Sequence, residues 1–113
     1  MASRGKSARN KGNSYERQVV KEFKEMGWTK ASTSRYSSKE NDDNKVDLCN
    51  VNPFNIQCKA VEGSVKYLEV LASMPVGDNI NCIFRKRNRE KQLVILTKDD
   101  FYKLIKDYIK GDK

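Results

Sequence analysis

Histidine is missing from this sequence, and several other residue types are scarce. Because none of the 113 residues is histidine, the Ser-His and Cys-His catalytic arrangements and any imidazole base are excluded. The chemistry available to the chain is therefore that of carboxylates, Lys, Tyr or a bound metal ion.

Cysteine is also infrequent. The chain contains Cys49, Cys58 and Cys82, an odd number without a CxxC pair. Without histidine, these residues do not make a structural zinc site. We expect three reduced thiols, as in an intracellular protein.

Long hydrophobic runs are absent. No stretch approaches the roughly 18 apolar residues of a membrane-spanning helix. Residues Met1–Lys11 also lack the apolar segment of a signal peptide. We therefore expect a cytoplasmic protein without a membrane partner, in the host cytoplasm if the gene is viral.

Acidic residues are in the minority, and this predicts the partner. The 23 Lys and Arg residues against 15 Asp and Glu give a net charge of +8, which attracts polyanions such as DNA. Residues 1–12 hold no acid, and we expect them to form a mobile basic arm, or a solvated terminus without a role. The residues expected to bind nucleic acid are Arg4, Lys6, Arg9, Lys11, Arg35, Lys39, Lys86, Arg87 and Arg89.

Apolar spacing predicts the elements of one domain over residues 13–113. Helices are predicted at about 13–26, 64–74 (capped by Ser64) and 99–110. Strands are predicted at 28–36, 46–51, 54–60, 80–85 and 93–97, with a hairpin at Asn52-Pro53. The expected fold is α/β: a central mixed five-stranded sheet flanked by helices, in the order α-β-β-β-α-β-β-α.

Four polar residues fall at positions where such a fold can bring them together. Glu16 lies within the apolar arc of the first helix, at about 100° per residue. Asp47 lies in an otherwise apolar strand, and Gln57 and Lys59 share one face of the next. Hydrolysis of a phosphodiester without histidine calls for a divalent metal, and magnesium prefers oxygen ligands.

Glu16, the Val-Asp-Leu segment at Asp47 and the Ile-Gln-Cys-Lys-Ala segment at Gln57 and Lys59 together resemble the PD-(D/E)XK nuclease superfamily. The order of elements is similar to its archaeal Holliday junction resolvase branch. The resemblance covers about residues 13–108 and implies a restriction-endonuclease-like fold. It also implies an endonuclease that uses Mg²⁺, with Mn²⁺ as a substitute.

The resemblance further implies roles for individual residues. Glu16, Asp47 and Gln57 would hold the metal, and Lys59 would orient or activate the attacking water. In the resolvase branch a serine precedes the aspartate near the scissile phosphate, and Ser37 or Ser38 fits that position.

Two residues depart from the family pattern. Val46 stands where proline often precedes the aspartate, and Gln57 replaces an acid with a weaker metal ligand. Glutamine occupies the same place in Mrr-like restriction nucleases. The acidic loop containing Glu40, Asp42 and Asp43 is the alternative source of a carboxylate; it is otherwise a solvated loop.

Several functions remain open from the sequence. The first is a homodimeric endonuclease that cuts branched DNA such as four-way junctions, since opposed strands suit a two-fold enzyme. A nicking, restriction-like or repair endonuclease is the runner-up. A catalytically inert nucleic-acid-binding module of the same fold and a basic RNA- or ribosome-associated protein are the alternatives from other classes.

Overall fold

The computed structural model describes residues 2–37, 39 and 44–111, with side chains from residue 9 onward except those of residues 36 and 37. None of the helices in these ranges is long and apolar enough to cross a bilayer. The elements, in chain order, are α1 (Ala2–Met26), β1 (Ser32–Thr33), α2 (Ser34–Ser37), β2 (Leu48–Cys49), β3 (Phe54–Lys59), α4 (Tyr67–Ser73), β4 (Ile80–Arg85), β5 (Leu93–Ile95) and α5 (Lys98–Gly111).

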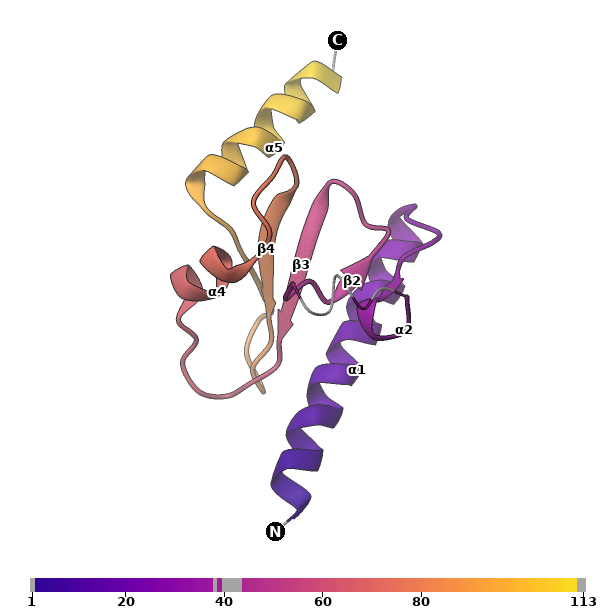
Figure 1. Cartoon of the computed structure of the whole chain (residues 1–113), viewed down its shortest axis with the longest axis vertical. Helices are drawn as coiled ribbons and strands as arrows, with labels where there is room; N and C mark the ends of the chain where they lie inside the picture. The colour runs from indigo at the N-terminus through magenta and orange to yellow at the C-terminus, as the bar shows by residue number, and fades with distance from the viewer. Residues whose placement is uncertain (1, 38, 40–43, 112–113) are drawn as a thin grey trace.

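The fold is α/β, as expected, but the described residues form two small sheets and not one of five strands. Strands β1 and β2 form a two-stranded antiparallel sheet, and β3, β4 and β5 form a mixed three-stranded sheet. Strand β3 pairs with β4 in parallel, and β4 pairs with β5 in antiparallel fashion. The α4 crossover joins the two parallel strands (Figure 1).

The predicted hairpin is a chain reversal between two sheets. The turn at Asn52-Pro53 contains a cis peptide bond, and the backbone N–H of Asp47 donates to the carbonyl of Ile56 (2.8 Å). The next available N–H, that of Cys58, donates to the Asp47 side chain instead of a backbone carbonyl (2.7 Å). The Asp47 side chain therefore occupies a backbone donor that a longer pairing of β2 with β3 would use.

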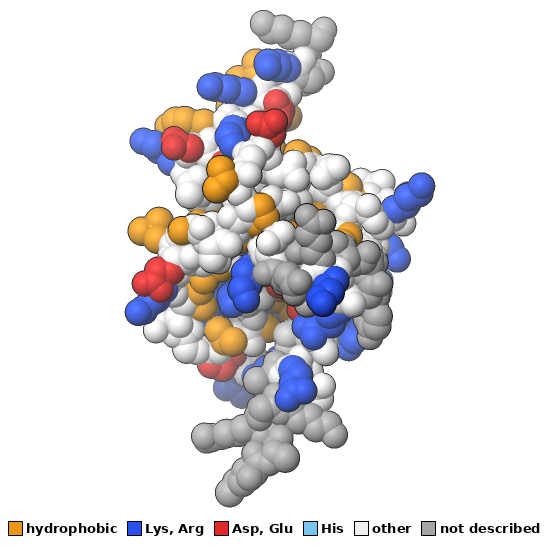
Figure 2. Space-filling view, in the orientation of Figure 1, with side chains coloured by type: hydrophobic (Ala, Val, Ile, Leu, Met, Phe, Trp, Pro, Cys, Tyr) orange, Lys and Arg blue, Asp and Glu red, His pale blue; other side chains and the backbone are white. Residues whose placement is uncertain are grey.

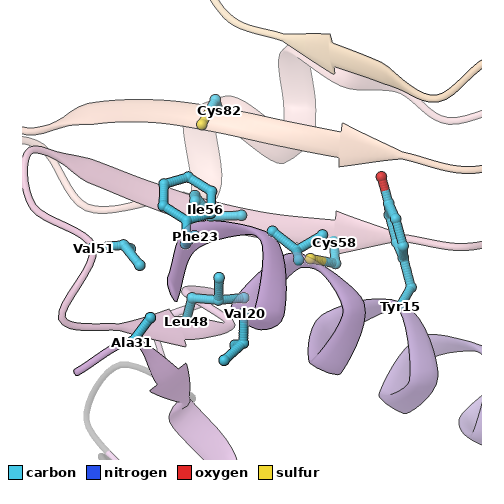
Figure 3. Packing of buried hydrophobic residues seen from close by; sticks show 10 residues of the cluster. Tyr15, Val20, Phe23, Ala31, Leu48, Val51, Ile56, Cys58 and Cys82 are labelled. Atoms are coloured by element: carbon cyan, nitrogen blue, oxygen red, sulfur yellow. The ribbon is translucent and has the colours of Figure 1, made fainter. Parts of the chain in front are cut away.

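The core lies between α1 and the sheets. Tyr15, Val19, Val20 and Phe23 are buried against Ile56, Cys58 and Cys82, as Figure 3 shows for most of them. The ring of Phe23 also contacts those of Trp28, Phe54 and Phe84, with centroids 5.1 to 6.2 Å apart. These contacts pack α1 over one face of β3 and β4.

The opposite face of the three-stranded sheet is covered by α4. Leu71 and Met74 pack on Ile83 there. Because side chains alternate along a strand, Gln57 and Lys59 lie on this second face, while Ile56 and Cys58 point to α1. The molecule is thus layered as helix, sheet and helix.

Three helix boundaries differ from those predicted. Helix α1 begins at Ala2 rather than near residue 13, so it continues through Gly5 and Gly12 although glycine disfavours helix. Helix α4 begins at Tyr67, after Lys66 rather than Ser64. Helix α5 begins at Lys98 rather than at residue 99. It is capped by Thr97, whose Oγ1 accepts the N–H of Asp100 (3.1 Å).

Candidate active site

Glu16 lies where the helical periodicity predicts, on the buried side of α1. It is 5% exposed, and its Oε2 forms an ion pair with Nη2 of Arg35 at 3.1 Å. Arg35 belongs to α2, which the backbone bond from Ser34 N–H to the Asp47 carbonyl ties to the strand region (2.8 Å). Arg35, which the sequence predicts as a DNA-binding residue, therefore neutralises the charge of Glu16 in this structure.

Asp47 lies directly before β2, with its carboxylate turned toward β3. Oδ2 accepts the Cys58 N–H at 2.7 Å. Burial raises the pKa of Asp47 to about 6, and the charge of Glu16 adds to this, whereas the Cys58 N–H, Lys59 and Arg35 act in the opposite direction. A nearby cation would therefore stabilise the ionised carboxylate.

Gln57 and Lys59 meet on the same face of β3. In the amide orientation that satisfies both neighbours, the Gln57 oxygen accepts from Nζ of Lys59 (3.2 Å) and its nitrogen donates to the Lys45 carbonyl (3.3 Å). Gln57 is 8% exposed. It therefore positions the Lys59 ammonium in addition to its predicted part as a metal ligand.

Charged groups from four separate segments act on one another at this place. Asp47 interacts electrostatically with Glu16 from α1, Arg35 from α2 and Lys59 from β3. In Figure 2, acidic atoms are visible between Lys and Arg side chains in the middle of the molecule. The fold thus brings a second carboxylate and two cations from segments far apart in the chain within electrostatic range of Asp47.

The donor set fits a hard divalent ion that keeps several waters. Magnesium is commonly held by one or two carboxylates together with substrate phosphate. In the described ranges no three Asp, Glu, Cys or His side chains cluster as a metal site. Glu16, Asp47 and the Gln57 oxygen remain the residues that the sequence predicts as ligands for magnesium or manganese.

Arg85 is a residue that sequence reasoning missed. It is 2% exposed, and its Nη2 donates to the Gly63 carbonyl, while its Nε and Nη1 have no partner within the described part of the chain. In the parallel register it lies beside Lys59. Strand alternation from Ile83 would have placed it on this face, where it adds a buried positive charge next to the candidate site.

A cavity of about 390 Å³ opens beside the end of β3. It is lined by Asn10, Lys11, Ser14, Ala60, Glu62, Lys86 and Asn88. Lys86 lies over the Tyr15 ring, 5.8 Å from its centroid, and Glu62 accepts the backbone N–H of Asn88 (3.0 Å). The N-terminal half of α1 and the β4–β5 turn therefore meet at a polar, cationic hollow.

The remaining expected DNA contacts vary in their surroundings. Arg9, Lys11, Lys39 and Arg89 are exposed, and Arg87 pairs with Glu90 at 3.6 Å. Arg4 and Lys6 belong to α1, but their side chains lie outside the described part, as does that of Ser37. Ser38 and the acidic loop residues Glu40, Asp42 and Asp43 also lie outside it.

Comparisons with known proteins returned nothing: no protein family model, no curated protein and no solved structure matches this chain. The function of the chain is therefore inferred from the geometry of its site and from the resemblance of its motifs.

Proposed function

We propose that this chain is a divalent-metal-dependent DNA endonuclease of the PD-(D/E)XK type, with Glu16, Asp47, Gln57 and Lys59 as its active site. The observation that carries the proposal is the electrostatic cluster at Asp47, where Glu16 and Lys59 act on one partly buried carboxylate. A structural ion pair needs two charges, whereas this cluster gathers groups suited to metal binding and water activation.

Each residue has a defined part in the proposed reaction. Glu16, Asp47 and the Gln57 oxygen would hold the metal, which when bound polarises the phosphoryl oxygen and acidifies water. The Lys59 ammonium, held by Gln57 at 3.2 Å, orients the attacking water and offsets the negative charge that develops on the phosphate. Arg35 must share or release Glu16 when the metal binds, because it contacts Oε2.

The proposed substrate is branched DNA such as a four-way junction. The cationic residues at the β4–β5 turn and on α1 offer phosphate contacts beside the polar hollow. These contacts carry affinity without base specificity, and the preference for branched DNA comes from the resemblance to junction resolvases. A nicking, restriction-like or repair endonuclease remains the alternative substrate class.

The test is a cleavage assay on end-labelled four-way junction, linear duplex and single-stranded DNA. Each is incubated with magnesium, manganese or a chelator. We expect metal-dependent products that are most abundant on the junction. Equal cleavage of linear duplex would favour the restriction-like alternative, and no cleavage with either metal would refute the nuclease proposal.

A second candidate is an inert DNA-binding module with the same fold. Two observations favour it: Gln57 is neutral where the family has an acid, and the Arg35 guanidinium already neutralises Glu16. Such a module binds the junction equally well with metal or chelator and leaves it intact. Fluorescence anisotropy on the same junction separates the two candidates, because it measures binding without cleavage.

A further inference from the structure

The cavity beside the end of β3 lies at the carboxyl ends of the two parallel strands. Ala60 directly follows β3, Lys86 directly follows β4, and both residues line the cavity. The Lys86 N–H donates to the Lys59 carbonyl (2.9 Å), so the strand pairing continues to the cavity wall. Ligands of open α/β sheets bind at this end of the strands. We call this space the strand-end cavity, and its volume of about 390 Å³ is in the range of small-molecule sites.

The polar residues that line the strand-end cavity are of more than one kind. They include the lysines Lys11 and Lys86, the asparagines Asn10 and Asn88, and one acid, Glu62. A simple anion is attracted by the two cations but repelled by the carboxylate. The mixture therefore fits a ligand that has an anionic part and also an uncharged part that donates hydrogen bonds.

Contacts at the cavity hold its cation and its carboxylate in place. Lys86 Nζ lies 5.8 Å from the ring centroid of Tyr15, a buried side chain that reaches from α1 to the end of β3 (Figure 3). Glu62 Oε2 accepts the Asn88 N–H at 3.0 Å. A carboxylate has about four acceptor positions, so Glu62 keeps capacity for a ligand. Both charged groups are thus positioned before a ligand binds.

We infer that the strand-end cavity binds one unpaired nucleotide, with its phosphate on the lysines and its base against Glu62 and the asparagines. A carboxylate accepts from the amino group that guanine, adenine and cytosine carry and thymine lacks. The side-chain amides of asparagine can pair with donors or acceptors on a base edge. The cavity should therefore prefer an amino-bearing base to thymine.

This inference rests on the proposed function, because it takes DNA as the partner, and it adds a feature of the substrate. Ala60 follows Lys59 directly, and Ser14, which also lines the cavity, lies two residues before Glu16. The cavity thus adjoins the candidate active site on both β3 and α1. A base enters a pocket at the lowest cost where it is already unpaired. The expected preference is for an unpaired nucleotide close to the cut phosphate, as at a branch point.

The test is an NMR titration of the whole chain without metal, which follows the side-chain amides of Asn10 and Asn88. The probes are deoxyguanosine monophosphate, thymidine monophosphate and inorganic phosphate. We expect saturable shifts of both amides, with deoxyguanosine monophosphate bound at least about fivefold more tightly than either other probe. Equal affinities for the three probes would overturn the inference, as would the absence of shifts at both asparagines.

Matched variants separate recognition of the base from recognition of the phosphate. Glu62→Gln can still accept the Asn88 N–H but loses the charge, so it should remove most of the preference for deoxyguanosine over thymidine monophosphate. Glu69→Gln removes an exposed acid on α4 and should keep the preference. Lys86→Gln should weaken both nucleotides alike, whereas the exposed control Lys66→Gln should weaken neither.

An unchanged preference in Glu62→Gln would overturn the inference. None of these measurements involves cleavage, so the two proposals fail separately. A chain that binds deoxyguanosine monophosphate in the strand-end cavity but cuts no DNA would refute the nuclease and leave the cavity assignment standing. A chain that cuts DNA but binds the three probes equally would do the reverse.

Discussion

The two ends of the molecule both carry lysines, yet their charge balance differs. Residues 1–15 contain four cations and no acid, and residues 85–91 contain five cations and one acid. Helix α5 pairs four Lys with three Asp around an apolar stripe. An unbalanced cationic surface attracts phosphate, whereas a balanced apolar one favours protein contact. Under the proposed function, DNA binding is therefore expected at the first end and not at the second.

The largest effect on binding is expected at the N-terminal half of α1. Replacing Arg4, Lys6, Arg9 and Lys11 with Gln keeps helix-forming residues but removes four cations. The slope of log affinity against log salt should become shallower by up to about four, with a loss of affinity of at least about tenfold. Anisotropy titrations on junction DNA at several salt concentrations measure both. An unchanged slope would mean that this half of α1 does not contact phosphate.

A matched pair of triple variants compares the two ends directly. Replacing Lys86, Arg87 and Arg89 with Gln should lower the slope of log affinity against log salt by about three. Replacing Lys98, Lys106 and Lys110 with Gln removes the same number of cations from α5. This variant should leave the slope nearly unchanged. Equal effects of the two triple variants would contradict the division of roles between the ends.

Asp47, in the candidate site between the two ends, is expected to lower the stability of the folded protein near neutral pH. The folded pKa of Asp47, about 6, lies above its ordinary value of 3.8, so the folded state binds the proton more tightly. The destabilisation is full above about pH 6 and vanishes below about pH 4. Asp47→Asn, which still accepts the Cys58 N–H, should raise the free energy of unfolding by about 1–3 kcal/mol near neutral pH.

Denaturant unfolding at neutral and acidic pH measures this difference. The control is Asp78→Asn, since Asp78 is exposed and should change stability little at either pH. A gain from Asp47→Asn that persisted unchanged below about pH 4 would contradict the electrostatic explanation.

The smallest effect is expected at Gln57. Gln57→Glu restores a carboxylate and should tighten manganese or magnesium binding to the free protein several-fold, as measured by calorimetry. Gln92→Glu adds the same charge at an exposed residue and should not. If the two variants behaved alike, Gln57 would act only by positioning Lys59, and the loop with Glu40, Asp42 and Asp43 would become the better ligand source.

Periodicity predicted the parts of this fold that have a buried face. The inward position of Glu16 and the bounds of β4 were predicted correctly because apolar periodicity records burial. Met26, which has the same helical spacing as the buried residues of α1, is 63% exposed at the end of the helix. The helical residues 2–12 were missed because their sequence has no apolar periodicity and contains two glycines. The single sheet was wrong because Asp47, read only as a site residue, also takes the Cys58 N–H that a longer β2 would need.

The sequence predicted which residues belong to the candidate site, but it did not predict the contacts between them. Strand alternation places Gln57 beside Lys59. Nothing in the sequence relates Arg35 to Glu16, because their ion pair depends on how α2 is positioned by the Asp47 carbonyl. Arg85 was missed because it stands at the end of the predicted strand 80–85, next to the basic residues Lys86 and Arg87, and an arginine is seldom buried.

Single-turnover cleavage of a labelled four-way junction by Asp47→Asn and Lys59→Met tests the central claim most directly. Asp78→Asn and Lys66→Met are the matched exposed controls. The account predicts that each site variant loses at least about a hundredfold in rate while junction affinity stays near that of wild type. Cleavage at the wild-type rate by either site variant would contradict the assignment of the active site.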